Sequence, residues 1–444
     1  MRIVAQVAAA VQAVFGTSID DLARATRCVQ RQRKFSGTSL ARTLVLTVLL
    51  RPAAKNRDYR AMAAKAGVHV TEEAIDHRFT DELVLFLEGI LQQAVSQTLA
   101  GKDSAAPLLQ QFSDVRIGDS TTLTLPDEFA DRFPSCGGSE NASLAALKIQ
   151  VSWSLLTGRL LGWQITSGRA SDAKSEIAEV LPPAGSLSVF DPGYFSLERF
   201  RRVGEADAYW ISRLQHGTKV FDAAGKSLDV PAFLRMQGEN GLVDIAVLLG
   251  EKERLPCRLI AVRVPEEVAS RRRQRIRQKA RDHGREPSQE YLELQGWMIF
   301  VTNCGKELLT WKEVVVLYRA RWQIELLFKL WKSHNHVAEL EPGVSPQRQM
   351  AVLYAKLIGV IVQHWILLSV AWNDAQRSLR KAAAILRDWI VLLLAVLDDD
   401  ERLRDLLGRW GAAAAKTARI TRRRKRPSLF QLLDNPELLD YIVA

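Results

Sequence analysis

The chain has 444 residues, of which 47% are hydrophobic and 25% are charged, a balance that is typical of folded globular proteins and excludes a largely disordered chain. Its length, about three times that of a typical domain, predicts several domains with at least one sizeable core. The net charge of +11 is concentrated in two basic runs, at residues 271–281 and 422–426. Because Lys and Arg side chains that neutralise phosphates release counterions, these runs favour a polyanionic partner. Solvated helix faces and a basic tail are the alternative interpretation.

Three features of the sequence favour a location in the cytoplasm. The four cysteines are far apart and form no CxxC pair, so neither a zinc site nor a disulfide framework is indicated. The apolar N-terminal run is interrupted by Gln6 and Gln12, which predicts an amphipathic helix and not a signal peptide. Residues 357–372 are apolar but too few to span a membrane, and they include Gln363 and His364. We therefore expect a buried core helix there.

The N-terminal region, residues 1–105, has apolar side chains at helical spacing and is predicted to be helical. Within residues 58–83 the pattern predicts one helix, a turn at Gly67 and a second helix that begins near Thr71. A DNA-binding helix-turn-helix has this shape and would bring His77 and Arg78 close to DNA. An ordinary helical hairpin has the same pattern, so both interpretations stay open.

From Val115 onward, short strands and helices alternate. Three strands with a hairpin at Gly158 come first, and two helices then each lead to a further strand. The segments are strands 115–123, 145–158 and 159–168, helix 172–181, strand 186–190, helix 196–206 and strand 208–214. Antiparallel strands followed by alternating helices and parallel strands predict one mixed sheet with helices on both faces.

A different region follows, with strand candidates at 242–250 and 257–264 and a basic helix at 266–284. We expect this region to interrupt the mixed sheet, which resumes at 297–303. A long helix is predicted from Trp311 to about His334, and the remainder is predicted to be helical. The chain therefore divides into five predicted segments, which are 1–105, 106–214, 215–294, 295–345 and 346–444.

Two aspartates follow apolar strand segments. Asp119 lies where the strand VRIG runs into STTL, and Asp191 lies where the strand SLSVF runs into PGYF. Carboxylates in such positions project from a rigid sheet, and hard divalent cations such as magnesium prefer oxygen ligands. Asp is also a common turn residue at the end of a strand, so each aspartate alone is weak support for a metal site.

A third acidic residue lies on the helix predicted after Trp311. Its polar stripe consists of Tyr318, Arg321, Glu325 and Lys332. At about 100° per residue these four positions fall within about 60° of one another, and the rest of the circumference is mostly apolar. A carboxylate between cationic groups suits a metal ligand beside a phosphate backbone. An intrahelical ion pair between Arg321 and Glu325 is the alternative.

Taken together, these motifs resemble those of a known family. DSTTL begins at Asp119, DPGYFS begins at Asp191, and YRARWQIELLFKLWKS has the spacing Y-x2-R-x3-E-x6-K. The set resembles the bacterial insertion-sequence transposases of the D-D-E type, which move by cut and paste through hairpin DNA ends. The resemblance covers most of residues 110–345. Pro192 is a departure, because relatives often carry another residue after the second aspartate.

The resemblance implies a ribonuclease-H-like catalytic core, formed by 106–214 and 295–345 and interrupted by a strand-rich insertion at 215–294. It implies that three carboxylates bind two Mg²⁺ or Mn²⁺ ions, which activate the attacking oxygen and stabilise the leaving one. These ligands are Asp119, Asp191 and Glu325. It further implies that other residues hold the DNA end, with the tryptophan stacking on a flipped base. These residues are Tyr318, Arg321, Lys332 and Trp297.

The same resemblance assigns roles to the two ends of the chain. Residues 1–105 would bind the terminal inverted repeats of the transposon, and residues 346–444 would pair two protomers as a homodimer on two DNA ends. The protein would then be a DNA transposase located in the cytoplasm and associated with the nucleoid. A ribonuclease-H-like nuclease that does not join ends, an inactive DNA-binding derivative of a mobile element and, for Trp297, a core residue on a strand are the alternatives.

Overall fold

The computed structural model describes residues 2–31, 34–137, 143–237, 240–372, 376–420 and 427–439. The predicted basic run at 422–426 lies outside these residues. The fold is α/β, with a mixed sheet of nine described strands in the order β3-β2-β1-β4-β5-β9-β8-β7-β6. The chain forms two compact units. Unit 1 comprises residues 1–105, 120–170 and 324–421, and unit 2 comprises residues 106–119, 171–323 and 422–444.

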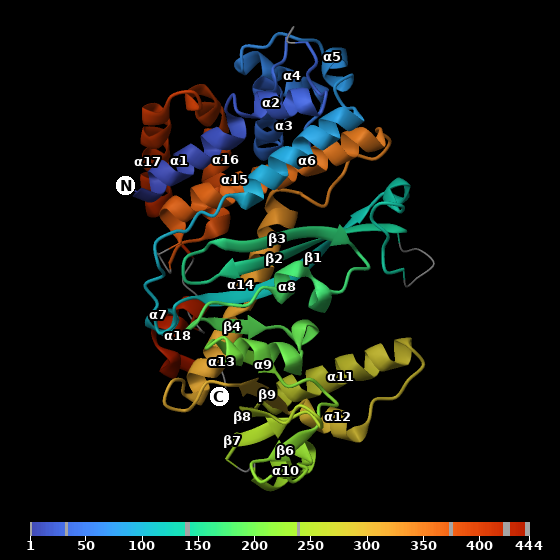
Figure 1. The fold of residues 1–444 in the computed structure, drawn as a ribbon, viewed down its shortest axis with the longest axis vertical. Coiled ribbons are helices and arrows are strands. Elements are labelled where there is room, and N and C mark those ends of the chain that lie inside the picture. Colours follow the sequence, from blue (N-terminus) through green and yellow to red (C-terminus); the bar gives the residue numbers. More distant parts are fainter. Residues whose placement is uncertain are drawn as a thin grey trace. The chain divides into compact units, whose positions relative to one another are not determined.

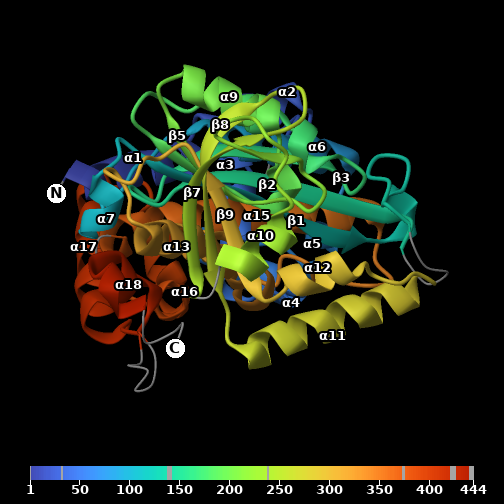
Figure 2. The ribbon, with the colours of Figure 1, turned by 90° about the horizontal axis from the view of Figure 1, so that it is seen from below.

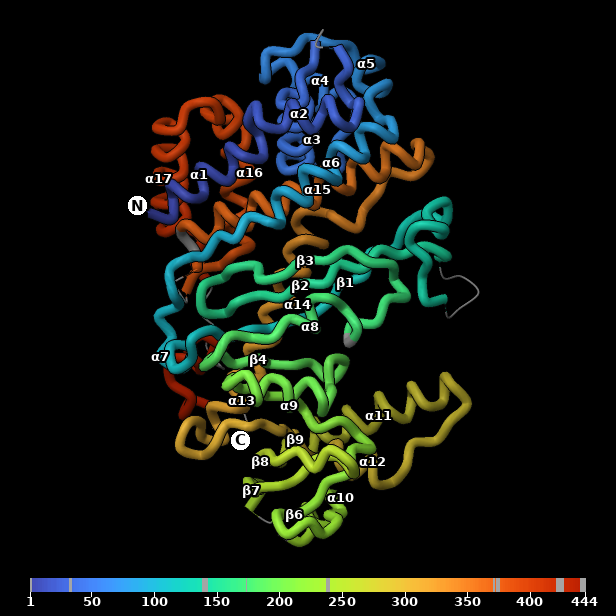
Figure 3. The backbone as a smooth tube through the Cα atoms, in the orientation of Figure 1, coloured from blue at the N-terminus to red at the C-terminus, as the bar shows by residue number. Residues whose placement is uncertain are grey.

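Unit 1 is largely a helical assembly built from both ends of the chain. Its helices are α1 (Arg2–Phe15), α2 (Ile19–Ala25), α3 (Gly37–Leu50), α4 (Asn56–Lys65), α5 (Glu72–Asp76), α6 (Asp81–Ser96), α15 (Pro346–Ala371), α16 (Leu379–Val396) and α17 (Asp400–Thr417). Helix α15 packs against α1, α3, α6, α16 and α17, and the N-terminal α1 lies beside the C-terminal α17 (Figures 1 and 3). The helical N-terminal region therefore shares its core with the helical C-terminal region.

Two helices in the described part of the chain are long and apolar enough to cross a membrane by length and composition alone. One covers Arg2–Ala25 and is 39% buried, and the other covers Pro346–Ser369 and is 94% buried. The second corresponds to α15, whose apolar side chains face the other helices of unit 1. An apolar helix buried on all sides is what the centre of a large helical core requires.

The segment with helix-turn-helix shape consists of α4, a turn and α5. Gly67 adopts a φ of +79° in the turn, where a side chain would be strained. Thr71 caps α5 by accepting a hydrogen bond from the backbone N–H of Ala74. The buried Arg348 of α15 donates to the side chains of Asn56 and Asp76, each at 2.6 Å. These bonds hold both helices on the core of unit 1.

Unit 1 also contains a β-hairpin, formed by β2 (Ala145–Ser154) and β3 (Leu160–Ser167) in antiparallel register. The predicted turn contains Gly158, whose φ is +73°. A Cβ atom on Gly158 would come within 2.5 Å of the side chains of Leu368 and Trp372. Glycine is therefore required there both by backbone conformation and by the close approach of α15.

Unit 2 holds the parallel part of the sheet. The first segment of β1 (Val115–Leu125) pairs in parallel with β4 (Leu187–Phe190), and β4 pairs in parallel with β5 (Tyr209–Arg213). Strand β1 contains Asp119 and runs on to Leu125, two residues beyond the predicted strand at 115–123. Its described pairing with β4 ends at Ile117, so Asp119 lies in the middle of the strand where that pairing stops.

The strands of the predicted insertion extend the same sheet. Strand β9 (Trp297–Thr302) pairs antiparallel with β5 and with β8 (Leu255–Arg263), and β7 (Leu242–Leu249) and β6 (Val220–Asp222) follow outward. They share a core with α9 (Leu197–Glu205), in which Phe200 stacks on Trp210 at 4.3 Å. Helices α10 (Val230–Gln237), α11 (Glu266–Asp282) and α12 (Gln289–Leu294) complete this region. The sheet thus resumes at β9, as predicted for 297–303, and the strands of the inserted region extend its outer edge beyond β9.

The long helix predicted from Trp311 to His334 is three consecutive helices. They are α13 (Trp311–Ala320), α14 (Trp322–Lys329) and a π-helical turn at Leu330–His334. Arg321 lies between the first two, and the backbone N–H of Asn335 bonds to the carbonyl of Leu330, five residues back. A π turn shifts the angular position of later residues, so Lys332 does not continue the ideal helical stripe.

Short elements complete the chain. They are α7 (Pro107–Gln110), α8 (Glu176–Glu179), α18 (Leu429–Asp434) and the 3₁₀ turns Asp127–Phe129, Asp172–Lys174, Pro192–Tyr194 and Pro436–Leu439. Helix α18 packs against α7 and α13 within unit 2. In place of the helix predicted at 172–181, the structure has a 3₁₀ turn followed by the single turn of α8.

Candidate active site

The two aspartates follow the paired segments of two neighbouring parallel strands. Val115 pairs with Leu187, and the pairing of β1 with β4 ends at Ile117 and Val189. Asp119 lies two residues after Ile117 on β1, and Asp191 lies two residues after Val189, directly after the end of β4. Both carboxylates therefore lie close to where this pairing ends.

Arg321 joins these two carboxylates. Its Nη1 atom lies 3.3 Å from Oδ2 of Asp119 and 3.1 Å from Oδ1 of Asp191. The side chains are only 15%, 22% and 29% exposed, for Arg321, Asp119 and Asp191 respectively. Partial burial weakens solvent screening, so this interaction is stronger than a surface ion pair. Residues that are 202 and 130 positions apart in the chain from Arg321 therefore meet at one cationic nitrogen.

The backbone after β4 fixes the position of Asp191. Its carboxylate accepts a hydrogen bond from the backbone N–H of Gly193 at 3.1 Å and caps the 3₁₀ turn at Pro192–Tyr194. Proline suits the first position of such a turn, because its fixed φ matches and its missing N–H would have no partner there. The departure at Pro192 is thus compatible with an ordered Asp191.

Tyr318 lies next to this cluster on α13. Its ring packs against Phe300 of β9 with 5.1 Å between centroids. Burial raises the pKa of the Tyr318 phenol to about 12, while the charge of Arg321 lowers it and that of Asp191 raises it. The phenol therefore keeps its proton near neutral pH and is available as a hydrogen-bond donor.

Arg213 is a residue that sequence reasoning missed. Phe190, the last residue of β4, pairs with Ser212 of β5, and Arg213 directly follows as the last residue of β5. The charge of Arg213 also acts on the Tyr318 phenol, as does that of Asp191. Strand pairing therefore adds a cation beside the end of β4, a relationship that the sequence alone does not reveal.

Lys332 and Glu325 belong to the part of the helix that lies in unit 1. The ammonium of Lys332 donates to the carbonyl of Thr122 at 2.9 Å, three residues after Asp119 on β1. Burial lowers the pKa of Lys332. Glu325 is half-buried on α14, four residues after Arg321 along the chain. Its convergence with the two aspartates stays a prediction.

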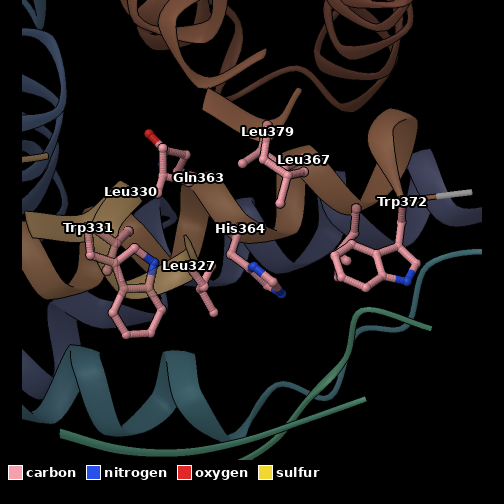
Figure 4. Close-up of a pocket in the computed structure, with 10 residues that line it drawn as sticks. Leu327, Leu330, Trp331, Gln363, His364, Leu367, Trp372 and Leu379 are labelled. Atoms are coloured by element: carbon pink, nitrogen blue, oxygen red, sulfur yellow. The ribbon is translucent and has the colours of Figure 1, made fainter. Parts of the chain in front are cut away.

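The apolar side of this helix packs on α15 within unit 1. Leu327, Leu330 and Trp331 face α15 at Gln363, His364 and Leu367 (Figure 4). His364 bonds through Nε2 to the carbonyl of Gly158 at 2.8 Å. This packing anchors the helix segment that carries Glu325 and Lys332.

Trp297 is located in a core. Its side chain is 8% exposed at the start of β9 and belongs to a hydrophobic cluster of unit 2. The guanidinium of Arg263 lies 5.1 Å from the ring centroid. Base stacking by Trp297 stays a prediction, and it would require the indole ring to become exposed.

Trp322 is a second residue that sequence reasoning missed. It directly follows Arg321 and is 56% exposed, although tryptophan is usually largely buried. Leu326, one turn later on α14, is 46% exposed. An apolar surface beside the cationic cluster is suited to contact the face of a base.

The donor set of the site suits a divalent cation. Among the described residues no group of three or more His, Cys, Asp and Glu side chains is arranged to hold a metal. The two aspartates nevertheless hold one cationic nitrogen between carboxylate oxygens, and such oxygens are the ligands that magnesium prefers. The residues therefore fit a hard cation at the position of the aspartate pair.

Comparison with known families decides what kind of protein carries this site. The family model described as "Transposase DDE domain" matches residues 110–340, more than half of the chain. The chain belongs to the DDE transposase family. The matched segment contains both aspartates and the helix segment from Tyr318 to Lys332. Members of this family generally use divalent metal ions, in agreement with the oxygen donors of the site.

Relatives of this DDE transposase extend the likeness to most of its length. It is 26% identical over 442 residues to "Transposase for insertion sequence element IS231F" of Bacillus thuringiensis subsp. israelensis, with 94% of this chain and 92% of that protein covered. It is 27% identical over 315 residues to "Transposase for insertion sequence element IS1151" of Clostridium perfringens, with 66% of each chain covered. The DDE transposase described here is thus an insertion-sequence enzyme that acts on DNA by cleavage and strand transfer.

Proposed function

We propose that this transposase moves its insertion sequence by a cut-and-paste route through hairpin DNA ends, using Asp119, Asp191 and Glu325 as its catalytic carboxylates. The observation that carries the proposal is the bridge from Arg321 to both aspartates. Within unit 2 this bridge joins Arg321, a member of the Tyr-Arg-Glu-Lys spacing, to both aspartates, which supports a shared role for the spacing and the two acids. In the same proposal, 106–214 and 295–345 form a ribonuclease-H-like core and 215–294 form its insertion.

The three carboxylates would hold two Mg²⁺ or Mn²⁺ ions. When bound, such ions make an oxygen nucleophile more reactive and neutralise charge on the phosphate and the leaving oxygen. Asp119 and Asp191 would contribute ligands from one face of the sheet. Glu325 would contribute the third from α14, whose first turn contains it.

The cationic residues around the carboxylates would bind the DNA end. Arg321 and Arg213 offer guanidinium groups that form strong hydrogen bonds to phosphate oxygens. Tyr318 would donate its phenolic hydrogen to a phosphate oxygen, because its raised pKa keeps the proton in place. Lys332, whose ammonium is held near β1, would supply a point charge. Together these groups would orient the phosphate in front of the carboxylates.

Hairpin formation requires a base to leave the stack at the DNA end, which costs free energy. Stacking of the base on an aromatic ring can offset part of this cost. Trp297 is our predicted stacking residue. The exposed Trp322 is a second candidate, supported by its 56% exposure next to Arg321.

The flanking regions would recognise and pair DNA ends. Residues 1–105, with α4 and α5 as a possible helix-turn-helix, would bind the terminal inverted repeats. Residues 346–444 would pair two protomers as a homodimer. The protein would act in the cytoplasm, in association with the nucleoid.

The experiment that tests this function combines purified transposase, Mg²⁺ and a labelled duplex that carries one end of the element. We expect nicked, hairpin and joined products in that order of appearance. Nicked product without hairpin or joining, at all times and with added target DNA, would favour a ribonuclease-H-like nuclease. Binding without any cleavage, in Mg²⁺ and in Mn²⁺, would favour an inactive derivative.

A further inference from the structure

Helix α11 carries an unusual density of positive charge. It contains seven basic residues within eleven positions, which are Arg271, Arg272, Arg273, Arg275, Arg277, Lys279 and Arg281. Between the glutamates of its first turn and Asp282 at its end, it contains no acidic residue. The basic residues divide into two sets that have different surroundings.

The first set holds α11 in place. Arg272 donates to the carbonyls of Gln295 and Trp297, at 3.5 and 3.4 Å. Arg273 donates through Nε to the carbonyl of Leu292 at 3.1 Å. Figure 2 shows α11 lying along the outside of α12, the helix that ends at Leu294. These two arginines therefore serve the packing of α11 on unit 2.

The second set faces solvent. Arg271, Arg275 and Lys279 are spaced four residues apart and form one row, and Arg277 and Arg281 form a second row. All five are exposed. Within the described part of the chain, none of them pairs with an acidic side chain. Like charges four residues apart destabilise a helix, so this arrangement has a cost in the isolated protein.

The exposed side of helix α17 has a different arrangement of charges. Its Arg404 pairs with Asp400 at 2.6 Å, and its Arg409 pairs with Asp405 at 2.9 Å. Each acid precedes its arginine by four residues, the spacing that stabilises a helix. The outer rows of α11 lack such partners. The macrodipole favours Lys279 and Arg281 in the last turn, but it gives no reason for Arg271 and Arg275.

The charge of α11 is continuous with that of the candidate site. Burial lowers the pKa of Arg272, and the positive charge of Arg213 lowers it further. Arg213 also acts on the phenol of Tyr318 beside Asp191. Within unit 2, the cationic side chains of Arg321, Arg213 and Arg272 thus lead from the aspartate pair to the packed side of α11.

We propose that the outer face of α11 binds the phosphate backbone of the double-stranded DNA on which the transposase acts. This inference rests on the proposed function. The row from Arg271 to Lys279 spans about 12 Å at about 1.5 Å per residue. One strand of B-DNA presents a phosphate about every 3.4 Å along its axis, so the row can reach about three phosphates. Contacts of this kind carry no sequence information and hold the duplex in register.

The test is the salt dependence of DNA binding by the full-length protein. We would compare Arg271→Gln/Arg275→Gln/Lys279→Gln with wild type on the element-end duplex and on a scrambled duplex. The slope of log K against log salt should become shallower by about 2 to 3 on both, because each lost phosphate contact removes about 0.9. Arg271→Lys/Arg275→Lys should keep the wild-type slope, because charge is preserved. Thermal unfolding of each variant checks that α11 stays folded through Arg272 and Arg273.

A matched control removes three charges elsewhere in unit 2, at the exposed Lys219, Lys226 and Lys252, by substitution with Gln. Its slope should equal that of wild type. An equal loss of slope in this control, or a wild-type slope in the α11 triple variant, would overturn the proposal for α11 while cleavage by wild type still supports the proposed function. Failure of wild type to bind either duplex would overturn both.

Discussion

Asp119 and Asp191 lie on either side of one guanidinium nitrogen, Nη1 of Arg321, at 3.3 and 3.1 Å. Asp119 is on β1, and Asp191 directly follows the neighbouring parallel strand β4. This geometry makes the two carboxylates one electrostatic unit.

The carboxylates should be required for cleavage and not for binding. Asp119→Asn, Asp191→Asn and Glu325→Gln each remove a proposed ligand charge and keep the size of the side chain. We expect the cleavage rate to fall by more than about 100-fold. Mutation of residues that only hydrogen-bond to metal ligands already lowers metal affinity or activity by about 10 to 100-fold. Gel shifts on the same preparations should show nearly unchanged affinity for the DNA end. Wild-type cleavage by the Glu325 variant would remove that residue from the site.

Arg321 should contribute to the rate of DNA cleavage through its positive charge. Loss of a hydrogen bond to a charged group costs about 1.5 to 3 kcal/mol, so Arg321→Ala should slow single-turnover cleavage by about 10 to 100-fold. Arg321→Lys should recover part of this rate, because one nitrogen contacts both carboxylates. If lysine and alanine variants cleave at the same rate, a role for this charge is excluded.

Trp297 should have a structural effect before any effect on hairpins. Removing a buried tryptophan costs about 3 to 5 kcal/mol, so Trp297→Ala should lower the thermal unfolding midpoint, whereas the exposed Trp322→Ala should not. On folded protein, we expect Trp297→Ala to nick the DNA end but to accumulate nicked product with much less hairpin. A wild-type yield of hairpin from the folded variant would leave Trp297 as a core residue only.

His364 should make the stability of the protein depend on pH. Burial lowers the pKa of His364 from 6.5 to about 4, and its bond to the Gly158 carbonyl opposes this shift. Between those values the unfolded chain binds a proton that the folded chain does not, so stability rises with pH from about 4 to about 6.5. Within this window, a rise of one pH unit increases the free energy of unfolding by at most about 1.4 kcal/mol.

His364→Gln should therefore flatten the dependence of the unfolding midpoint on pH in this window. The exposed His69→Gln is a control and should leave the dependence as in wild type. Identical pH profiles for His364→Gln and wild type would show that the buried imidazole does not titrate in this way.

The sequence by itself determined the local features of this transposase. Helical spacing and apolar composition predicted α15 and the basic helix α11, and the positive φ of Gly67 and Gly158 occurs at the turns where glycine had been expected. The spacing of Tyr318, Arg321 and Glu325, together with the motifs at Asp119 and Asp191, was enough to suggest the family. Such features depend on neighbours a few residues away, so a single sequence contains them.

Only the tertiary structure decided how distant segments meet. Where the pairing of β1 with β4 stops, which residue of β5 follows the pair Phe190–Ser212, and whether Trp297 is buried all depend on pairing and packing with segments that are remote in the chain. The ion pairs of Arg321 are of the same kind, because they join it to two carboxylates more than a hundred residues away. Strand register and burial are set by long-range contacts, and local patterns do not specify them.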